Sequence, residues 1–280
     1  MDMNTSPLST LKDPSLLKFD ALIDGQWVAG KSRFAVTDPA TGKHLADVAN
    51  LGANDAEAAI AAANKAWPQW RALTAKERSI ILRKWYDLLM AIQDDLCRIM
   101  TAEQGKPLPE DKGEVAYGAS FVEWFAEEAK RVNGEMLPQF DNNRRLLVMK
   151  SPVGVCAAIT PWNFPLAMIT RKVAPALAAG CPVVIKPAEL TPLTALAAAE
   201  LAIRAGIPAG VLNVITADEG NSIAVGKVLC ASDVVRHLSF TGSTEVGRIL
   251  MAQSAPTVKK LSLELGGNAP FLVFDDADID

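Results

Sequence analysis

Apolar residues recur every three or four positions over long stretches in the first half of the chain, and this spacing predicts amphipathic helices. The first helix is expected to begin at Asn54, because Glu57 stands three residues later as in a capping box. A second capping pattern, with Thr74 as the cap, predicts one long helix over about 74–105. A third helix is expected over about 110–132.

Residues typical of strands lie on both sides of these helices. ALIDGQWV, which contains the hairpin signal Asp24-Gly25, and SRFAVTDPATG predict antiparallel strands near the N-terminus. The letters GQWVAGKS, residues 25–32, match the phosphate-loop pattern of nucleotide hydrolases, but no helix is expected after them, so we interpret them as part of a hairpin. After the helices, RRLLVMK alternates like a strand but has no apparent sheet of its own.

From Val153 onward, short apolar runs alternate with helices. VGVCAAIT, CPVVIKP, VLNVIT, VVRHLSFTG and KKLSLEL are the expected strands, and one intervening helix is expected to start after Thr191 and stop at Gly206. This alternation predicts an α/β fold with a doubly wound, Rossmann-like parallel sheet. Ligands of such sheets bind at the carboxyl ends of the strands. The loops of interest are therefore those after Thr160, Lys186, Thr216, Phe240 and Leu263.

Composition and charge narrow the possible partners. The 280 residues are half hydrophobic and carry a net charge of −4, as in an ordinary soluble protein of one or two domains. The chain has no basic block and no uninterrupted apolar run of bilayer length, so neither nucleic acid nor membrane is an expected partner. The first twenty residues lack a signal-peptide pattern, and we expect a cytoplasmic protein. Four cysteines in apolar settings and two histidines predict buried, reduced thiols and no metal site.

Two of the strand-end loops carry polar residues with more than one interpretation. TPWNFP places Asn163 in a turn made rigid by flanking prolines, where its carboxamide could donate to a developing oxyanion or simply cap a helix. VVIKPAE places Lys186 and Glu189 just past a buried strand, where they could contact the hydroxyls or phosphates of a nucleotide or remain solvated loop charges.

The other two loops add an anion site and an isolated acid. In FTGST, Gly242 and Ser243 lead into a helix whose first amides could bind an anion. In LELGG, Glu264 stands in an otherwise apolar run, where an isolated carboxylate is costly unless it has a partner or a function.

Taken in order and spacing, PWNFP, KPAE-x-TP, FTGST-x-x-G and LELGG-x-x-P resemble the aldehyde dehydrogenase superfamily over nearly the whole chain. EWFAEEAKR and MITRK most resemble the succinate-semialdehyde dehydrogenases. The resemblance implies a homo-oligomeric oxidoreductase that converts succinate semialdehyde to the acid with NAD or NADP, in 4-aminobutyrate degradation. Glutarate semialdehyde or another carboxylated aldehyde is an alternative substrate, and a non-catalytic cofactor-binding module is an alternative function.

The resemblance also implies residue roles. In this family a cysteine thiolate attacks the aldehyde, so Asn163 would hold the oxyanion, Glu264 would activate the water that hydrolyses the thioester, and Arg171 would bind the substrate carboxylate. The implied cofactor-binding residues are Thr160, Pro161, Trp162, Asn163, Lys186, Glu189, Gly242, Ser243 and Leu265. Many relatives carry a neutral Ser where this chain has Glu189, and we expect NAD to be preferred over NADP because a carboxylate repels a 2′-phosphate.

The domain organisation follows from the same resemblance. We expect a flexible N-terminus, two parts of the cofactor-binding domain separated by a bridging arm between subunits, and the start of a catalytic domain. In order, these are residues 1–18, 19–139, 140–152 (the arm), 153–263 and 264–280. The family's nucleophile lies beyond the LELGG motif in a GQ-x-C segment, and none of the four cysteines matches it, so we expect the 280-residue polypeptide alone not to oxidise aldehydes.

Overall fold

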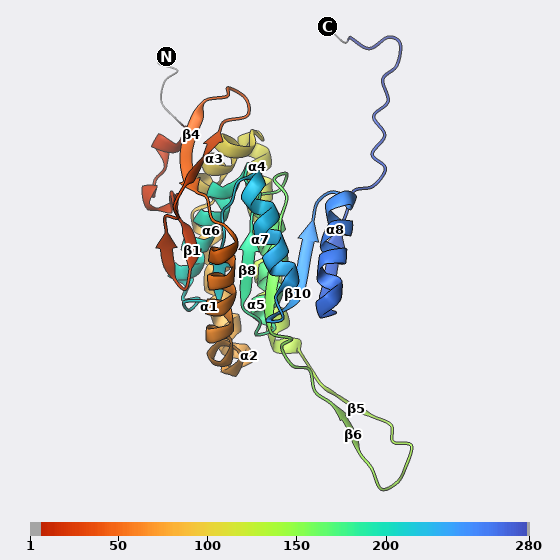
Figure 1. Ribbon diagram of the computed structural model, residues 1–280. Helices are drawn as coiled ribbons and strands as arrows, with labels where there is room; N and C mark the ends of the chain where they lie inside the picture. Colours follow the sequence, from red (N-terminus) through yellow and green to blue (C-terminus); the bar gives the residue numbers. More distant parts are fainter. Residues whose placement is uncertain (1–6, 279–280) are drawn as a thin grey trace.

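A seven-stranded sheet forms the centre of the computed structural model, which describes residues 7–278 (Figure 1). Its strand order is β11-β10-β7-β8-β9-β1-β2. The strands are β1 (Ala21–Ile23), β2 (Gln26–Val28), β7 (Val155–Ile159), β8 (Val183–Lys186), β9 (Leu212–Val214), β10 (Val235–Thr241) and β11 (Lys260–Glu264). The pairs from β11 to β9 are parallel, which confirms the predicted α/β fold, whereas β1 and β2 extend the sheet in antiparallel fashion.

Helices cover both faces of this sheet. They are α1 (Ala53–Ala72), α2 (Ala75–Ala91), α3 (Gln93–Gln104), α4 (Leu108–Glu128), α5 (Ala167–Ala178), α6 (Pro192–Ala205), α7 (Glu219–Ala231) and α8 (Thr244–Ser254). Helices α2 to α6 lie on one side, and α1 and α7 on the other (Figure 1). Within residues 7–278, no helix is both long and apolar enough to cross a bilayer.

The central strands are apolar throughout because each of their faces is buried. In β7, Cys156 and Ala158 belong to the core beneath α5, whereas Val155 and Ala157 belong to the core beneath α1. In β8, Val184 faces the α1 side and its neighbours face the α5 side. This alternation explains why a continuous apolar run, rather than a half-polar one, predicts strands of a doubly wound sheet.

Two predicted helix boundaries are wrong. Helix α1 begins at Ala53 with Gly52 as its cap, and the side chain that accepts the Gly52 amide is Asp55 at 2.9 Å, so Asn54 is not the cap. The long helix expected over 74–105 is divided at Ile92 into α2 and α3. Acidic residues at a helix N-terminus are favourable, and two of them open α3. The capping box at Thr74 is confirmed.

Helix α6 begins after Thr191 as predicted, but the threonine side chain makes no capping bond. Its place is taken by Glu103 from α3, whose two carboxylate oxygens accept the amides of Leu193 and Thr194 at 2.7 Å each. A carboxylate distant in the sequence therefore satisfies the first turn of this helix.

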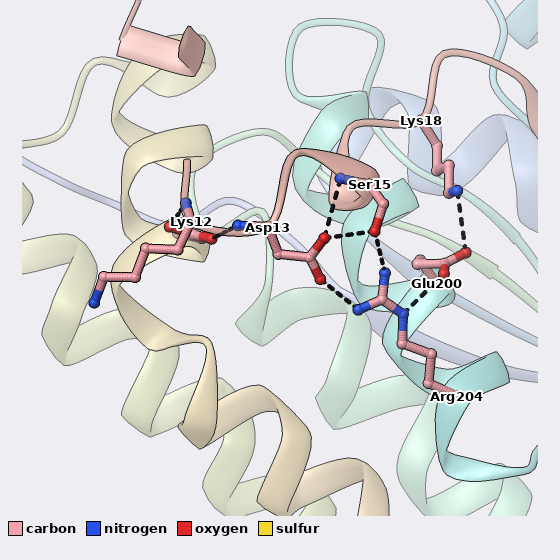
Figure 2. Close-up of polar contacts among 7 residues, drawn as sticks. Lys12, Asp13, Ser15, Lys18, Glu200 and Arg204 are labelled. Atoms are coloured by element: carbon pink, nitrogen blue, oxygen red, sulfur yellow. Dashed lines mark hydrogen bonds and ion pairs between the residues drawn. The ribbon is translucent and has the colours of Figure 1, made fainter. Parts of the chain in front are cut away.

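The segment 7–18 is packed against the body, so the expectation of a flexible N-terminus is wrong for these residues; residues 1–6 lie outside the described part. It contains the short 3-10 helices Pro7–Thr10 and Pro14–Leu16, and Leu16 is fully buried. Figure 2 shows its polar contacts: the guanidinium of Arg204 on α6 donates to Asp13 and Ser15. The carboxylate of Asp95 on α3 accepts the backbone amides of Lys12 and Asp13 at 3.0 and 2.8 Å.

Two hairpins form the N-terminal β structure. In the first, Asp24 and Gly25 connect β1 to β2 with φ values of 50° and 74°, the left-handed pair that a tight two-residue turn requires. The second joins β3 (Arg33–Thr37) to β4 (His44–Ala49). Residues 25–32 therefore contain β2 and a connecting loop, which confirms that they are not a phosphate loop.

The arm is a two-stranded hairpin that extends away from the body (Figure 1). Its strands are β5 (Glu135–Leu137) and β6 (Leu146–Val148). The RRLLVMK segment thus has a partner strand, contrary to our expectation, and the arm starts before residue 140. Its apolar side chains are largely exposed: Met136, Leu137, Phe140, Leu147, Val148 and Met149. Residues 265–278 also run away from the body, with Phe271 and Phe274 exposed (Figure 1).

Candidate active site

The four motif loops follow adjacent parallel strands, so they meet at one edge of the sheet. The loop after β7 is tied to the end of β8 by the Thr160 amide, which donates to the Lys186 carbonyl at 3.2 Å. The loop after β10 is tied to the end of β11 by the Gly242 amide, which donates to the Glu264 carbonyl at 3.1 Å. The carboxyl-end location expected for a ligand site in such a sheet therefore holds all four motifs.

Asn163 lies in the loop between β7 and α5, with its side chain exposed. Thr160 is buried at the base of this loop, Pro161 is half-buried, and the Trp162 ring is exposed. The amides that open α5, those of Leu166 and Ala167, are bound by the carboxylate of Glu114. Asn163 is therefore not the cap of this helix, and its carboxamide is accessible to a ligand.

Lys186 and Glu189 form an ion pair, with Lys186 Nζ 3.0 Å from Glu189 Oε2. The Lys186 side chain is 7% exposed and that of Glu189 is 35% exposed, so the lysine is not a solvated loop charge. Burial lowers the pKa of Lys186, and the neighbouring carboxylate opposes this effect. Glu189 and Trp162 line a cavity of about 280 Å³ together with Glu103 and Thr37.

Gly242 and Ser243 form the turn that leads into α8. Ser243 is the N-cap, and its hydroxyl oxygen accepts the Val246 amide at 3.2 Å. The amides before Val246 in this first turn have no acceptor within the helix and can bind an anion. Leu265 packs against Gly247 near the start of α8. A Cβ at position 247 would lie 2.6 Å from Leu265 Cδ2, so only glycine leaves room for this leucine.

Glu264 and Arg171 line a second cavity, of about 260 Å³, on the α5 side of the sheet. Lys172 and His237 contribute to the same cavity. Lys172 Nζ donates to the Ser239 hydroxyl at 2.9 Å. Burial lowers the pKa of Lys172 to about 8, the Arg171 charge acts in the same direction, and Glu264 opposes both. The site thus combines an acid with three basic groups.

Sequence reasoning missed Lys172, and it also missed the two carboxylates, Glu103 and Glu114, that cap helices near the site. The signal for Lys172 was its position beside Arg171 on a helix that is otherwise apolar. The two glutamates gave no local signal, because their partners are more than fifty residues away in the chain.

All four cysteines are buried and free, in α3, β7, the loop before β8, and α7. Burial raises the pKa of Cys97 to about 11 and also raises that of Cys230. Cys181 differs from these two thiols: a hydrogen bond from the Cys156 thiol lowers its pKa, and nearby backbone amides and the Arg78 guanidinium act in the same direction. Its side chain is nevertheless buried, away from the carboxyl edge of the sheet.

A family model described as the aldehyde dehydrogenase family matches residues 27–280. The chain belongs to this family. Among curated relatives of this aldehyde dehydrogenase chain, the succinate-semialdehyde dehydrogenase [NADP(+)] GabD of Escherichia coli is 61% identical over 272 residues, which are 96% of this chain and 56% of that protein. The 3-sulfolactaldehyde dehydrogenase and the glutarate-semialdehyde dehydrogenase of Pseudomonas putida are 60% and 59% identical over the same share of this chain, covering 55% and 56% of those proteins.

Solved structures agree with this assignment. A crystal structure described as an E. coli NADP-dependent enzyme matches with a TM-score of 0.91 and 60% identity, over 96% of this chain and 56% of that one. The NAD+ complex of Staphylococcus aureus betaine aldehyde dehydrogenase matches with a TM-score of 0.89 and 35% identity, over 97% and 54%. The chain therefore spans about half the length of the relatives it matches.

The aldehyde dehydrogenase family uses NAD(P)+, and the residues at the sheet edge suit a dinucleotide. The first turn of α8 can bind the pyrophosphate, and Glu189 can accept hydrogen bonds from ribose hydroxyls. Lys186 lies 3.0 Å from that carboxylate and supplies a donor. Within residues 7–278, no group of three His, Cys, Asp or Glu side chains is arranged to hold a metal ion.

Proposed function

We propose that this chain is the cofactor-binding and base-carrying half of an NAD(P)+-dependent dehydrogenase for a carboxylated semialdehyde, with succinate semialdehyde as the first substrate. The observation that carries the proposal is the cavity on the α5 side of the sheet that Arg171 and Glu264 share. Asn163 lies in the connection that leads into α5, the helix that carries Arg171. The three curated relatives described above are named for aldehydes that also bear an anionic group. A guanidinium at this place suits such a substrate, because it binds a carboxylate through two parallel hydrogen bonds.

Each residue then has a chemical role. The Asn163 carboxamide donates to the oxygen that becomes negative when the family's cysteine attacks the aldehyde. Glu264 takes a proton from the water that hydrolyses the resulting thioester. NAD(P)+ supplies the hydride acceptor when it is bound. Arg171 holds the far end of the substrate and so fixes the position of its aldehyde carbon.

Glutarate semialdehyde, one methylene longer, is the second candidate substrate. The support is the P. putida relative, which is named for that activity and is 59% identical to this chain. An extra methylene changes binding by only about 1–3 kcal/mol, so the two substrates are separated by relative kcat/KM rather than by presence or absence of activity.

The proposal extends to the cofactor, the assembly and the location of the protein. We propose NAD rather than NADP as the cofactor, because the Glu189 carboxylate lines the cavity beside Trp162 and would repel a 2′-phosphate bound there. The arm, with its exposed apolar side chains, is proposed as a contact between subunits of a homo-oligomer. We also propose that the protein acts in the cytoplasm and, with succinate semialdehyde as its substrate, in 4-aminobutyrate degradation.

The test uses a chimeric enzyme in which this chain replaces the aligned part of the E. coli relative. We expect it to oxidise succinate semialdehyde, and Arg171→Ala to raise KM for succinate semialdehyde by about 10- to 100-fold, the value of one charge-assisted pair. Butanal, which lacks the carboxylate, should be oxidised equally by both forms.

Arg236→Ala is the matched control, because Arg236 is exposed near the opposite end of β10. Equal losses on succinate semialdehyde and butanal would refute the role of Arg171. No oxidation of any carboxylated aldehyde by the folded chimera would refute the proposed function.

A further inference from the structure

The backbone that carries Asn163 is held on both sides by an ion pair from another part of the fold. Lys106 lies in the connection between α3 and α4, and Glu114 lies on α4. Lys106 Nζ is 2.5 Å from Glu114 Oε2. Their side chains are 13% and 1% exposed, so both charges are largely removed from water.

Lys106 binds the loop on its N-terminal side. Its ammonium donates to the Asn163 carbonyl oxygen at 3.1 Å. The same ammonium lies 4.1 Å from the centroid of the Phe164 ring, within the range of a cation–π contact. The carbonyl of Asn163 and the ring of the next residue are therefore fixed by one side chain.

Glu114 binds the loop on its C-terminal side. Glu114 Oε1 accepts the amides of Leu166 at 3.1 Å and Ala167 at 3.4 Å, at the point where α5 begins. Gly118, one turn further along α4, allows this close approach: a Cβ there would lie 3.0 Å from Leu166 Cγ and 3.3 Å from the Ala167 nitrogen. Helix α4 and the loop are thus in direct contact.

Stability alone does not account for this pair. Two buried charges lose their hydration, and an apolar pair of similar volume is often as stable or more stable. An oxyanion donor, in contrast, must be placed accurately, since an error of about 1 Å can cost roughly 100-fold in rate. Asn163 is exposed, so no close packing holds its side chain, and the backbone fixes the point from which the carboxamide extends.

We propose that Lys106 and Glu114 are positioning residues for Asn163, which clamp residues 163–167 so that the carboxamide points at the reacting oxygen. This inference rests on the proposed function, because it assigns the clamp to the same oxyanion donor. It adds two residues that do not touch the substrate but set the geometry of one that does.

Two measurements test the clamp, with Lys106→Met and Glu114→Gln as the variants. The first is amide hydrogen exchange at Leu166 and Ala167, followed by NMR in the 280-residue chain. The second is steady-state kinetics in the chimera, with kcat and the KM for NAD(P)+ determined separately. Lys112→Met and Glu110→Gln are the controls, since both residues are exposed and lie near Glu114 on α4.

We expect the two variants to speed exchange at Leu166 and Ala167 and to lower kcat by about 10- to 100-fold. The KM for NAD(P)+ and the controls should not change. Lys106→Arg keeps the charge and the donors, and it should recover most of the lost kcat. A purely structural role would instead lower the unfolding temperature, with activity recovering on cooling and no rescue by arginine.

Unchanged exchange in both variants, or unchanged kcat despite faster exchange, would overturn the proposal. If neither variant folds, the wild-type chain decides: Leu166 and Ala167 should exchange more slowly than Thr244 and Glu245 in the first turn of α8, and equal rates would overturn the clamp. An inactive wild-type chimera would refute the proposed function. It would leave the clamp to be decided by the exchange rates of Leu166 and Ala167, which are measured in the 280-residue chain.

Discussion

Glu189→Gln should move the cofactor preference of this chain from NAD+ toward NADP+. The substitution keeps the shape of the side chain and removes its charge. In the structure that charge lies 3.0 Å from Lys186 Nζ, and the carboxylate is 35% exposed. Because the lysine is 7% exposed, it stays in place and becomes an unpaired cation once the carboxylate is gone.

The magnitude follows from Coulomb's law with partial screening. Two unit charges about 5 Å apart interact by roughly 1 kcal/mol in water and about 3 kcal/mol at an effective dielectric constant of about 20. The 2′-phosphate carries about 1.5 to 2 negative charges, but water and Lys186 screen the carboxylate, so we take about 1–2 kcal/mol of repulsion. NAD+ loses a charged acceptor for its ribose hydroxyl, which costs about 1 kcal/mol. The ratio of dissociation constants should therefore shift by at least about tenfold.

The assay is titration calorimetry of both cofactors against the chimera, at low and high salt. Exposed Glu110→Gln on α4 is the matched control, because it removes the same charge from a residue that does not line the cavity of Glu189. The shift should shrink as salt is added, since screening weakens the repulsion. Tighter binding of NADP+ than NAD+ by the unmodified protein, or an unchanged ratio in the variant, would refute the reasoning.

Three further predictions address the fold and the chain itself. Asp13→Asn should lower the free energy of unfolding, measured in urea, by about 1 kcal/mol at neutral pH, because the hydrogen bond from Arg204 no longer joins two charged groups. Arg204 lowers the pKa of Asp13, so this contribution is present above the unfolded pKa of 3.8 and is lost as pH falls through the folded pKa. A contribution that does not change with pH would contradict this prediction. Burial raises the pKa of Glu103 from 4.5 to about 8, so its contribution to folding stability is largest below pH 4.5 and is lost as pH rises through about 8. The stability of the wild type relative to Glu103→Gln should therefore fall between about pH 5 and about pH 8.5. A rise over this range would contradict the prediction, because it would mean that folding favours the ionised carboxylate. The 280-residue chain, folded by circular dichroism, should form no NAD(P)H from succinate semialdehyde, because its four thiols are buried; turnover abolished by replacing one cysteine would place the nucleophile among them.

The parts of the fold that follow local rules could be predicted from the sequence. The parallel sheet was predictable because burial of both strand faces requires continuous apolar runs, and the hairpin at Asp24-Gly25 because few residues tolerate its turn. The capping box at Thr74 is equally local.

The errors concern features set by distant contacts. Helices α2 and α3 separate at Ile92, beside Asp95, which binds the N-terminal segment more than eighty residues away. Strand β5 is three exposed residues long, too short to give a periodic signal. Asn54 with Glu57 matched the capping pattern, but the helix begins two residues earlier than that pattern requires, with Gly52 as its cap and Asp55 as the side chain that accepts the Gly52 amide.

The site likewise has a part that could be predicted from the sequence and a part that could not. Motif order placed the loops with Asn163, Lys186, Gly242 and Glu264 at one sheet edge, because parallel strands end together. The clamp that binds the Asn163 loop was not predictable, because Lys106 and its carbonyl partner are 57 residues apart. Pairings at that separation are decided by the packing of α4 against α5, which no local pattern describes.

The most direct test of the central claim is a single-turnover measurement on the chimera with Glu264→Gln. If Glu264 is the base that hydrolyses the thioester, the variant should form about one NAD(P)H per site and accumulate an acyl adduct detectable by mass spectrometry. Steady-state turnover should fall by about 100-fold or more, because removal of a general base typically costs 10²- to 10⁴-fold. Steady-state turnover equal to that of the unmodified chimera, or loss of turnover with neither burst nor adduct, would contradict the account.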